Sequence, residues 1–164
     1  MAATGRHRTI GGGWIADKSG LMIRGMSAQI EVVAEPTSEH REAIALPLRE
    51  YNRRYGPPLT AKPVGILLKD ETGTSVGGLW GRIAYDWLFI ELLAVPESLR
   101  GKKHGAALVT AAEEIARREG CLGVWLDTYE FQSRGFYERV GYSVFGALDD
   151  HPAGSTRFFM KKRL

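Results

Sequence analysis

The chain has 164 residues, enough for one domain with a sizeable core, and its 44% hydrophobic and 25% charged residues are ordinary for a globular protein. The formal net charge of +3 suits an anionic ligand but is too small to indicate a nucleic-acid-binding protein. The single cysteine, Cys121, excludes an intrachain disulfide and is typical of a reducing compartment, and no apolar run reaches membrane-spanning length.

The first 25 residues differ in composition from the rest of the chain. Three consecutive glycines at positions 11–13 and scattered basic residues show no sustained hydrophobic period, which predicts a flexible extension over residues 1–25. A basic targeting segment is the alternative interpretation. Because the start lacks the apolar core of a signal peptide, we expect a cytoplasmic protein that binds no membrane. Residues 26–164 are expected to form a single domain.

The first predicted elements are a strand over residues 29–34 and a helix. Thr37 or Ser38 is a suitable helix cap, and the acidic residues that follow predict a helix that runs to residue 55. Pro47 lies inside this stretch and is expected to kink or divide it.

A three-strand meander is predicted after the Gly-Pro-Pro sequence at positions 56–58, which breaks the helix. Residues 64–69 and 76–85 have strand-like patterns, and the polar residues 69–73 between them are typical of a hairpin turn. Residues 87–95 form a long apolar run that predicts the third, buried strand.

A basic turn that contains glycine connects this third strand to an amphipathic helix. The strand run is interrupted by Glu91 and ends at Pro96, the turn at positions 100–106 reads RGKKHGA, and residues 107–120 place apolar residues at helical spacing. The amides at a helix start are unpaired and the helix dipole favours negative charge there. This arrangement predicts a site for a phosphorylated ligand.

The remaining elements alternate between strand and helix. We expect a strand over residues 122–128, a short helix over 131–140, and a final hairpin built from 142–146 and 156–160. This order predicts an α/β fold with a mixed, largely antiparallel central sheet flanked by helices.

The turn and the strand end before it resemble motif A of the GNAT superfamily of acyl-CoA-dependent N-acyltransferases. In that motif a strand ends in a V-x-P-like step, and R-G-x-G-x-G/A then leads into a helix. The matching residues here are Leu93, Ala94, Val95 and Pro96 at the strand end and Arg100, Gly101, Gly105 and Ala106 in the loop. Lys103 stands where the family usually has its central glycine. Neither GxGxxG nor GxxxxGK[ST] is present, which argues against the dinucleotide and P-loop alternatives.

A second segment, residues 131–142, resembles the end of GNAT motif B, in which F-Y-x-x-x-G-[FY] closes a short helix. The order of elements from residue 29 onward is also similar to that of the GNAT fold. The resemblance implies an N-acetyltransferase that uses acetyl-CoA as cosubstrate, needs no metal, and acetylates a primary amine of a small molecule or peptide. Because dimers are common in the family, it also implies that the chain could form a homodimer.

The resemblance assigns the carrier-binding roles. Main-chain groups at the strand end would hold the pantetheine arm, an amide near Leu93 would stabilise the oxyanion, and loop amides helped by nearby basic side chains would hold the pyrophosphate. Gln132 is a further polar candidate for contact with the arm. The full set expected to bind acetyl-CoA is Leu93, Ala94, Val95, Arg100, Gly101, Lys102, Lys103, His104, Gly105, Ala106 and Gln132.

Two residues are expected to act catalytically. By its place in motif B, Tyr137 would protonate the departing thiolate, and the alternative is a tyrosine that only packs in the helix face. Glu91 is the only carboxylate in its apolar strand, and such a group is costly unless it is paired or solvated. Simple alternation places Glu91 on one face with Phe89, Leu93 and Val95, from which it could accept the amine proton. Pairing with an Arg or Lys at the sheet rim is the alternative.

The acceptor site is less defined by the sequence. Trp80 and Tyr85 near the meander could bind a cationic or aromatic acceptor, with sheet packing as the alternative, and Asn52 is a further candidate. Asp127 at its strand end is a weaker acid–base candidate. Cys121 is poorly placed as a nucleophile, which favours direct transfer. The rival functions are a non-catalytic acyl-CoA-sensing module and an acetyltransferase acting on a macromolecule such as charged tRNA or a protein.

Overall fold

The computed structural model describes residues 14–17, 20–23, 30–59 and 61–164. The chain separates into two units, Met1–Gly56 and Pro57–Leu164. In the first unit, β1 (Trp14–Asp17) pairs antiparallel with β2 (Gly20–Ile23), a hairpin that the sequence patterns do not predict. Among the described residues, no helix combines the length and the hydropathy needed to cross a membrane.

The helix predicted to end at residue 55 is confirmed as α1 (Ser38–Tyr55). Thr37 is its N-cap, and the Thr37 hydroxyl accepts from the amide of His40 while the His40 ring accepts from the amide of Thr37. Of the two effects expected of Pro47, a kink or a division, the division is wrong, since α1 continues through Pro47. The strand expected over residues 29–34 is also wrong for its described part, where Ile30 forms a single bridge and residues 31–34 are irregular.

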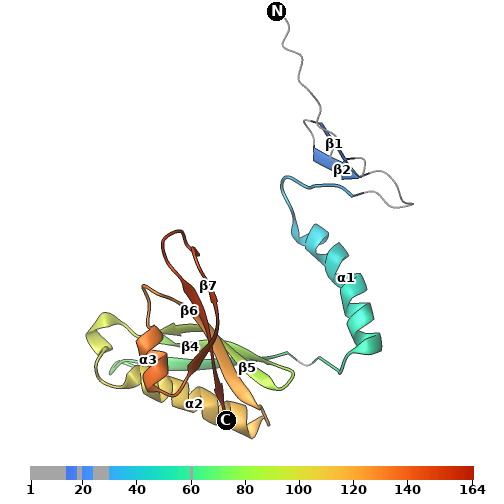
Figure 1. The fold of residues 1–164 in the computed structure, drawn as a ribbon. Coiled ribbons are helices and arrows are strands. Elements are labelled where there is room, and N and C mark those ends of the chain that lie inside the picture. Colours follow the sequence, from blue (N-terminus) through green and yellow to red (C-terminus); the bar gives the residue numbers. More distant parts are fainter. Residues whose placement is uncertain (1–13, 18–19, 24–29, 60) are drawn as a thin grey trace, which may run out of the picture. The chain divides into compact units, whose positions relative to one another are not determined.

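The second unit contains a six-stranded sheet with the order β3-β4-β5-β6-β8-β7. All neighbouring strands are antiparallel except β5 and β6, which confirms the mixed, largely antiparallel sheet. The final hairpin is inserted so that β8 lies between β6 and β7 (Figure 1). The strands are β3 (Lys62–Lys69), β4 (Ser75–Ala84), β5 (Trp87–Ala94), β6 (Gly123–Tyr129), β7 (Ser143–Leu148) and β8 (Arg157–Arg163).

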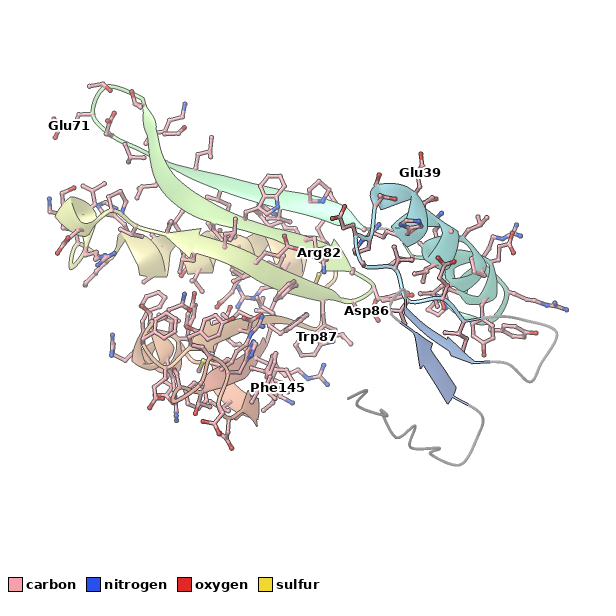
Figure 2. The ribbon with its side chains drawn as sticks, turned by 90° about the horizontal axis from the view of Figure 1, so that it is seen from above. Glu39, Glu71, Arg82, Asp86, Trp87 and Phe145 are labelled. Atoms are coloured by element: carbon pink, nitrogen blue, oxygen red, sulfur yellow. The ribbon has the colours of Figure 1, made fainter. Side chains whose placement is uncertain are left out.

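The β3–β4–β5 meander has the predicted turns. At the first turn, Asp70 accepts from the amides of Thr72 and Thr74, which replaces the backbone pairing that the turn interrupts. The second turn contains Tyr85, whose φ of 52° is left-handed, followed by Asp86. Figure 2 shows Glu71 and Asp86 at opposite ends of the meander, so the two turns are separated by the length of the strands.

The core lies between the sheet and α2 (His104–Arg118), which runs along one face of the strands (Figure 1). The buried face of α2 packs on inward side chains of β3, β4, β5 and β6, as the helical spacing predicts. Burial of one large aliphatic side chain here stabilises the fold by about 1.5–3 kcal/mol. Contributors include Leu88, Ile90, Leu108, Val109, Ala112, Val124, Leu126 and Met160.

The second helix of this unit, α3 (Arg134–Arg139), is shorter than the predicted 131–140 because residues 130–133 form a turn. Phe136 packs against the core cluster and Tyr137 lies within it. Gly141, with φ of 94°, ends the segment as predicted, since a left-handed residue after a helix favours glycine.

Candidate active site

A divergence of two parallel strands forms the centre of the candidate site. β5 and β6 pair from Trp87 with Gly123 to Ile90 with Leu126, and beyond those residues neither strand has a partner on this side within the described part of the chain. On its other edge β5 stays paired to β4, with Leu93 opposite Leu79. The backbone of residues 91–95 therefore presents a strand edge toward the opening, which we call the β5–β6 wedge.

A β-bulge at Glu91 begins the wedge. Trp80 pairs with Leu92 and Gly81 pairs with Ile90, so Glu91 is the extra residue on β5. A bulge bends a strand and increases its twist, which accounts for the separation of β5 from β6 at this point. The result is a main-chain edge positioned to pair with an extended, amide-bearing ligand.

The bulge also changes which side chains share a face. Leu93 and Val95 pack on the core, on the same side as Ile90, whereas Glu91 makes an ion pair with Arg82 on the opposite face. The expectation that Glu91 shares a face with Leu93 and Val95 is therefore wrong, because simple alternation fails across a bulge.

The basic turn places free amides beside the wedge. Gly101 has φ of 74° and Lys103 has φ of 65°, so both are left-handed, and α2 starts directly after them. The first amide of the helix with a backbone acceptor is that of Ala107, which donates to the Lys103 carbonyl, and no side chain caps the helix. The amides of residues 103–106 thus have no acceptor within the described chain, and they form an anion site at the positive end of the helix dipole.

Close packing explains one glycine of this turn. A Cβ added to Gly105 would lie 3.3 Å from the ring of Phe136 and 3.9 Å from Val95. The absence of a side chain lets the first turn of α2 lie directly against α3 and the end of β5. This packing brings the predicted phosphate loop, the predicted pantetheine edge and the Tyr137 helix into one place.

The basic and polar side chains predicted to contact the carrier differ in how they are engaged. The Arg100 Nε donates to the Val95 carbonyl at 3.2 Å, so Arg100 links the turn to the strand end. Lys102 and Lys103 are exposed, and His104 is half-buried. The Oε1 of Gln132 accepts from the Thr128 hydroxyl at 3.2 Å and from the Tyr129 amide at 3.0 Å, which leaves only the Gln132 amino group for a ligand.

Tyr137 belongs to α3, the helix that packs against the first turn of α2, and its ring is buried. It is 7% exposed and packs edge-on against Phe136 and Tyr142, with centroid distances of 5.0 and 5.9 Å. Burial, and secondly the negative charge of Asp127, raises the pKa of Tyr137 to about 12. The phenol is therefore fully protonated at neutral pH and can act as a hydrogen-bond donor.

Two ion pairs occupy the sheet face opposite α2. Arg82 pairs with Glu91 through Oε1, and its guanidinium lies 5.4 Å from the ring centroid of Phe89 (Figure 2 labels Arg82). Asp127, on β6 just beyond the end of the β5 pairing, contacts Arg157 at 2.7 Å. The pairing that the sequence left as the alternative for Glu91 is thus present, and Arg157 is a site neighbour that sequence reasoning missed. The register between β6 and β8 is the feature that could have indicated Arg157, since it places Arg157 opposite Tyr129.

The residues predicted to bind the acceptor are not all brought to the wedge. Trp80 lies beside the bulge, opposite Leu92, and is half exposed. Tyr85 lies at the other end of β5, in the turn before Trp87, where it lines an open hollow of about 400 Å³ with Asp86. Asn52 lies on α1 in the other unit, and its predicted role stays a prediction.

The comparisons with known proteins agree with this geometry. The model of the Acetyltransferase (GNAT) family matches residues 29–142. A blasticidin-S acetyltransferase from Streptomyces morookaense is 37% identical over 115 residues, which span 68% of this chain and 85% of that protein. An acetyltransferase from Agrobacterium fabrum is 35% identical over 127 residues, 77% of this chain and 92% of that protein.

Solved structures have the same fold. An acetyltransferase from Bacillus cereus has a TM-score of 0.75 and 31% identity, with 82% of this chain and 98% of that chain covered. An aminoglycoside 6'-N-acetyltransferase complexed with coenzyme A has a TM-score of 0.56 at 15% identity, with 80% and 94% covered, a likeness of fold alone. The sequence match, the mixed sheet and the wedge beside an uncapped helix together establish that the chain is an acyltransferase and belongs to the GNAT family of acetyltransferases.

Proposed function

We propose that the protein transfers an acetyl group directly from acetyl-CoA to a primary amine of a small molecule. The observation that carries this proposal is the β5–β6 wedge, which opens after Ile90 and Leu126 next to the uncapped start of α2. A strand edge and an anion site at this spacing suit a ligand with an amide-bearing arm and a pyrophosphate.

The carrier is held by main-chain groups in this proposal. The free edge at Leu93 and Ala94 pairs with the pantetheine amides as an added strand would, and the amides of residues 103–106 bind the pyrophosphate. Acetyl-CoA supplies the acetyl group as a thioester. An amide near Leu93 is then positioned to stabilise the oxyanion. The Val95 carbonyl is already engaged by Arg100 and is not needed for this pairing.

Proton transfers fall to side chains on the two sides of the wedge. As the amine nitrogen bonds to the acetyl carbon, the carbon–sulfur bond breaks, the amine gives up a proton and the thiolate leaves. Tyr137 donates a hydrogen bond to the leaving thiolate and stabilises it without complete transfer of the phenol proton. Glu91 accepts the amine proton through Oε2, while Oε1 stays paired with Arg82, which fixes the carboxylate at the bulge.

Direct transfer is favoured over an acetyl-enzyme because the single thiol is unsuited to nucleophilic attack. Cys121 is buried, and burial, followed by the charges of Glu119 and Asp86, raises its pKa. Only the thiolate is nucleophilic, so a raised pKa leaves Cys121 inert near neutral pH. The buried, free thiol also supports a location in the reducing cytoplasm.

The acceptor class is proposed from the relatives. The protein that is 37% identical over most of this chain is named for acetylation of blasticidin S, a small molecule, so we choose that compound as the first acceptor to test. The test measures release of free thiol from acetyl-CoA with blasticidin S, with other small primary amines, with peptides and without acceptor. Stimulation by a small amine supports the proposal. Thiol release that only peptides stimulate, or that no acceptor stimulates despite acetyl-CoA binding, would instead support the macromolecular or the sensing alternative.

A further inference from the structure

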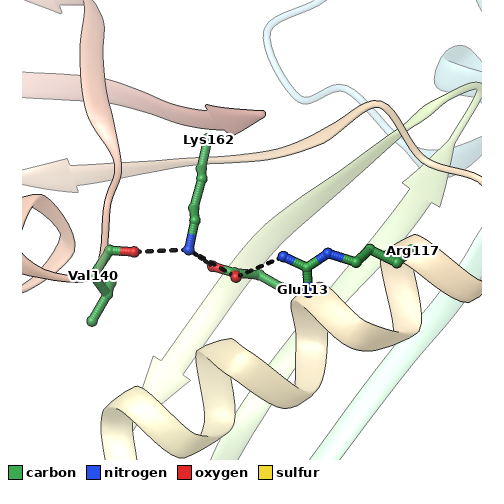
Figure 3. Close-up of polar contacts among 4 residues, drawn as sticks. All are labelled: Glu113, Arg117, Val140 and Lys162. Carbon is green, nitrogen blue, oxygen red and sulfur yellow. Dashed lines mark hydrogen bonds and ion pairs between the residues drawn. The ribbon is translucent and has the colours of Figure 1, made fainter. Parts of the chain in front are cut away.

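A polar cluster around the buried carboxylate of Glu113 joins β8, α2 and the end of α3. The Lys162 ammonium, from β8, donates to both carboxylate oxygens of Glu113 on α2, at 2.9 and 2.8 Å, and to the Val140 carbonyl at 2.9 Å (Figure 3). Arg117 approaches the same carboxylate at 3.6 Å from one turn further along α2. The three donations of Lys162 use all of its N–H groups.

Within this cluster the Glu113 carboxylate is buried, whereas the side chains of Lys162 and Arg117 are 27% and 50% exposed. The Glu113 side chain is 5% exposed, and a carboxylate at such depth is costly to bury unless it is paired and hydrogen-bonded. The stem of Lys162 passes under Gly141, where an added Cβ would lie 3.3 Å from its Cε. Its ammonium also lies 5.8 Å from the ring centroid of Tyr142. The Lys162 side chain is thus held by its contacts with Glu113, Val140 and the Gly141–Tyr142 segment.

The cluster is connected to Tyr137 by short steps. Val140, whose carbonyl Lys162 binds, closes α3, and its amide donates to the carbonyls of Phe136 and Tyr137. The Tyr142 amide donates to the Tyr137 carbonyl at 3.0 Å. The Glu113 end of the ion pair belongs to α2, the helix whose first turn forms the anion site. One ammonium therefore ties the helix that carries Tyr137 to the helix that starts at the proposed pyrophosphate site.

We propose that Lys162 is a positioning residue. By binding Glu113 and the Val140 carbonyl together, it fixes α3 against α2, and it so holds Tyr137 beside the part of the wedge where the thioester of acetyl-CoA would lie. This inference rests on the proposed function for the role of Tyr137. It assigns to Lys162 no contact with the carrier or the acceptor. Its loss should therefore affect turnover through Tyr137 and leave acetyl-CoA binding nearly unchanged.

The first test compares Lys162→Met with Lys162→Arg and with the control Lys62→Met. Lys62, on β3, also forms an ion pair at α2, with the C-cap residue Glu119, but that pair is exposed and includes no residue of α3. A misplaced catalytic group typically costs about 10- to 100-fold in rate, so we expect that loss of kcat in Lys162→Met, with the acetyl-CoA Kd within about 2-fold. Lys162→Arg should recover part of kcat and Lys62→Met should leave it unchanged. An unchanged kcat in Lys162→Met would overturn the inference.

The second test combines Lys162→Met with Tyr137→Phe. If Lys162 acts through Tyr137, adding Lys162→Met to Tyr137→Phe should lower kcat by less than about 2-fold, whereas a general structural role would give multiplied losses and overturn the inference. Should Lys162→Met fail to fold, Glu113→Gln combined with Lys162→Met removes the buried unpaired charge and takes its place in both tests.

Hydrogen exchange separates this inference from the proposed function. In Lys162→Met the Tyr142 amide should exchange faster than in the unaltered protein, while the Val109 amide in the middle of α2 should not change. If the unaltered protein transfers no acetyl group to any amine, the proposed function fails, and exchange alone decides the positioning role. Equal exchange at Tyr142 in the two proteins would then overturn it.

Discussion

Tyr137 shows how burial shapes the chemistry of a single residue. At its usual pKa of about 10, a phenol is roughly 1.5 units less acidic than a thiol near 8.5, but at about 12 the gap is roughly 3.5 units, or about 5 kcal/mol. In the proposed mechanism, complete proton transfer to the thiolate is therefore uphill, and the phenol would act chiefly by donating a hydrogen bond as the carbon–sulfur bond breaks. The same burial keeps Tyr137 protonated across the working pH range.

We predict that Tyr137→Phe lowers kcat by about 100-fold, the low end for a general acid, because the phenol is a weak one. The acetyl-CoA Kd should stay within about 2-fold, since the proposed function assigns carrier binding to main-chain groups. Steady-state kinetics and calorimetric titration measure the two quantities. Because the Tyr137 pKa is near 12, its ionisation should cause no fall in kcat below pH 10. Unaltered turnover in the variant would remove Tyr137 from the mechanism.

Lys103 stands where the GNAT motif usually has its central glycine, and this departure lowers the stability of the fold. Its φ of 65° is left-handed, a conformation that costs an L-residue with a Cβ about 1–2 kcal/mol and costs glycine little. We predict that Lys103→Gly raises the free energy of unfolding by about 1 kcal/mol, measured by chemical denaturation. Gly101→Ala is the matched control, since Gly101 has φ of 74° with no atom within 4 Å of an added Cβ, so only backbone strain should lower its stability. A less stable Lys103→Gly would refute this explanation of the loop.

The start of α2 is proposed to bind the pyrophosphate through main-chain amides, and no single side-chain substitution removes these amides. We predict that acetyl-CoA slows hydrogen exchange of the amides of residues 103–106, which have no acceptor in the described chain, and of Leu93 on the free edge of β5. Two-dimensional NMR of the protein with and without ligand measures this. The Cys121 amide, which donates to Ala116 at the other end of the helix, is the internal control and should not change. Protection spread equally over both ends of α2 would indicate general stiffening and not a bound phosphate.

The elements divide into those that the sequence predicts and those that it does not. Helical spacing from Leu108 to Ala116 predicts α2, because α2 buries that face. The apolar run that begins at Trp87 predicts β5, although β5 buries Leu88 and Ile90 on one face and leaves Leu92 exposed. The bulge at Glu91 leaves no pattern, since it depends on how β5 meets β4. The strand expected over residues 29–34 failed because strand propensity needs a neighbouring strand to pair with. The roles of the site residues that the motifs indicate stay predictions, whereas the engagement of Arg82 and Gln132 depends on tertiary contacts that no local pattern encodes.

At the scale of the whole molecule, the contribution of residues 1–25 to acetyl-CoA binding and turnover can be tested. In the described chain, every buried side chain belongs to residues 64–160, and the family match starts at residue 29. We therefore predict that a protein beginning at Met26 keeps the acetyl-CoA Kd and kcat of the full chain within about 2-fold. Calorimetry and the thiol-release assay on both proteins provide the comparison. A large loss of binding would show that residues 1–25 belong to the catalytic domain.

The whole molecule should also lose stability in alkali through two buried tyrosines. Burial raises the pKa of Tyr137 to about 12, and burial together with the charge of Glu113 raises that of Tyr142 as well. The unfolded chain, with tyrosines near pKa 10, releases these protons at lower pH than the folded chain, so unfolding is favoured as pH rises. The stability is nearly unaffected below about pH 9 and falls above it, by about 2.3 kcal/mol for Tyr137 alone by pH 12.

Tyr142→Phe tests this account of alkaline instability. The Tyr142 hydroxyl is buried, and it has no hydrogen-bond partner within the described residues, so its removal should cost little or nothing near pH 7. Between pH 10 and 12 the variant should lose stability less steeply than the unaltered protein, because one of the two proton releases is gone. Urea denaturation at each pH measures the two curves. Parallel curves would mean that Tyr142 titrates equally in the folded and unfolded chains, and the alkaline loss would then have to come from Tyr137 and from groups outside the Tyr137–Tyr142 contact.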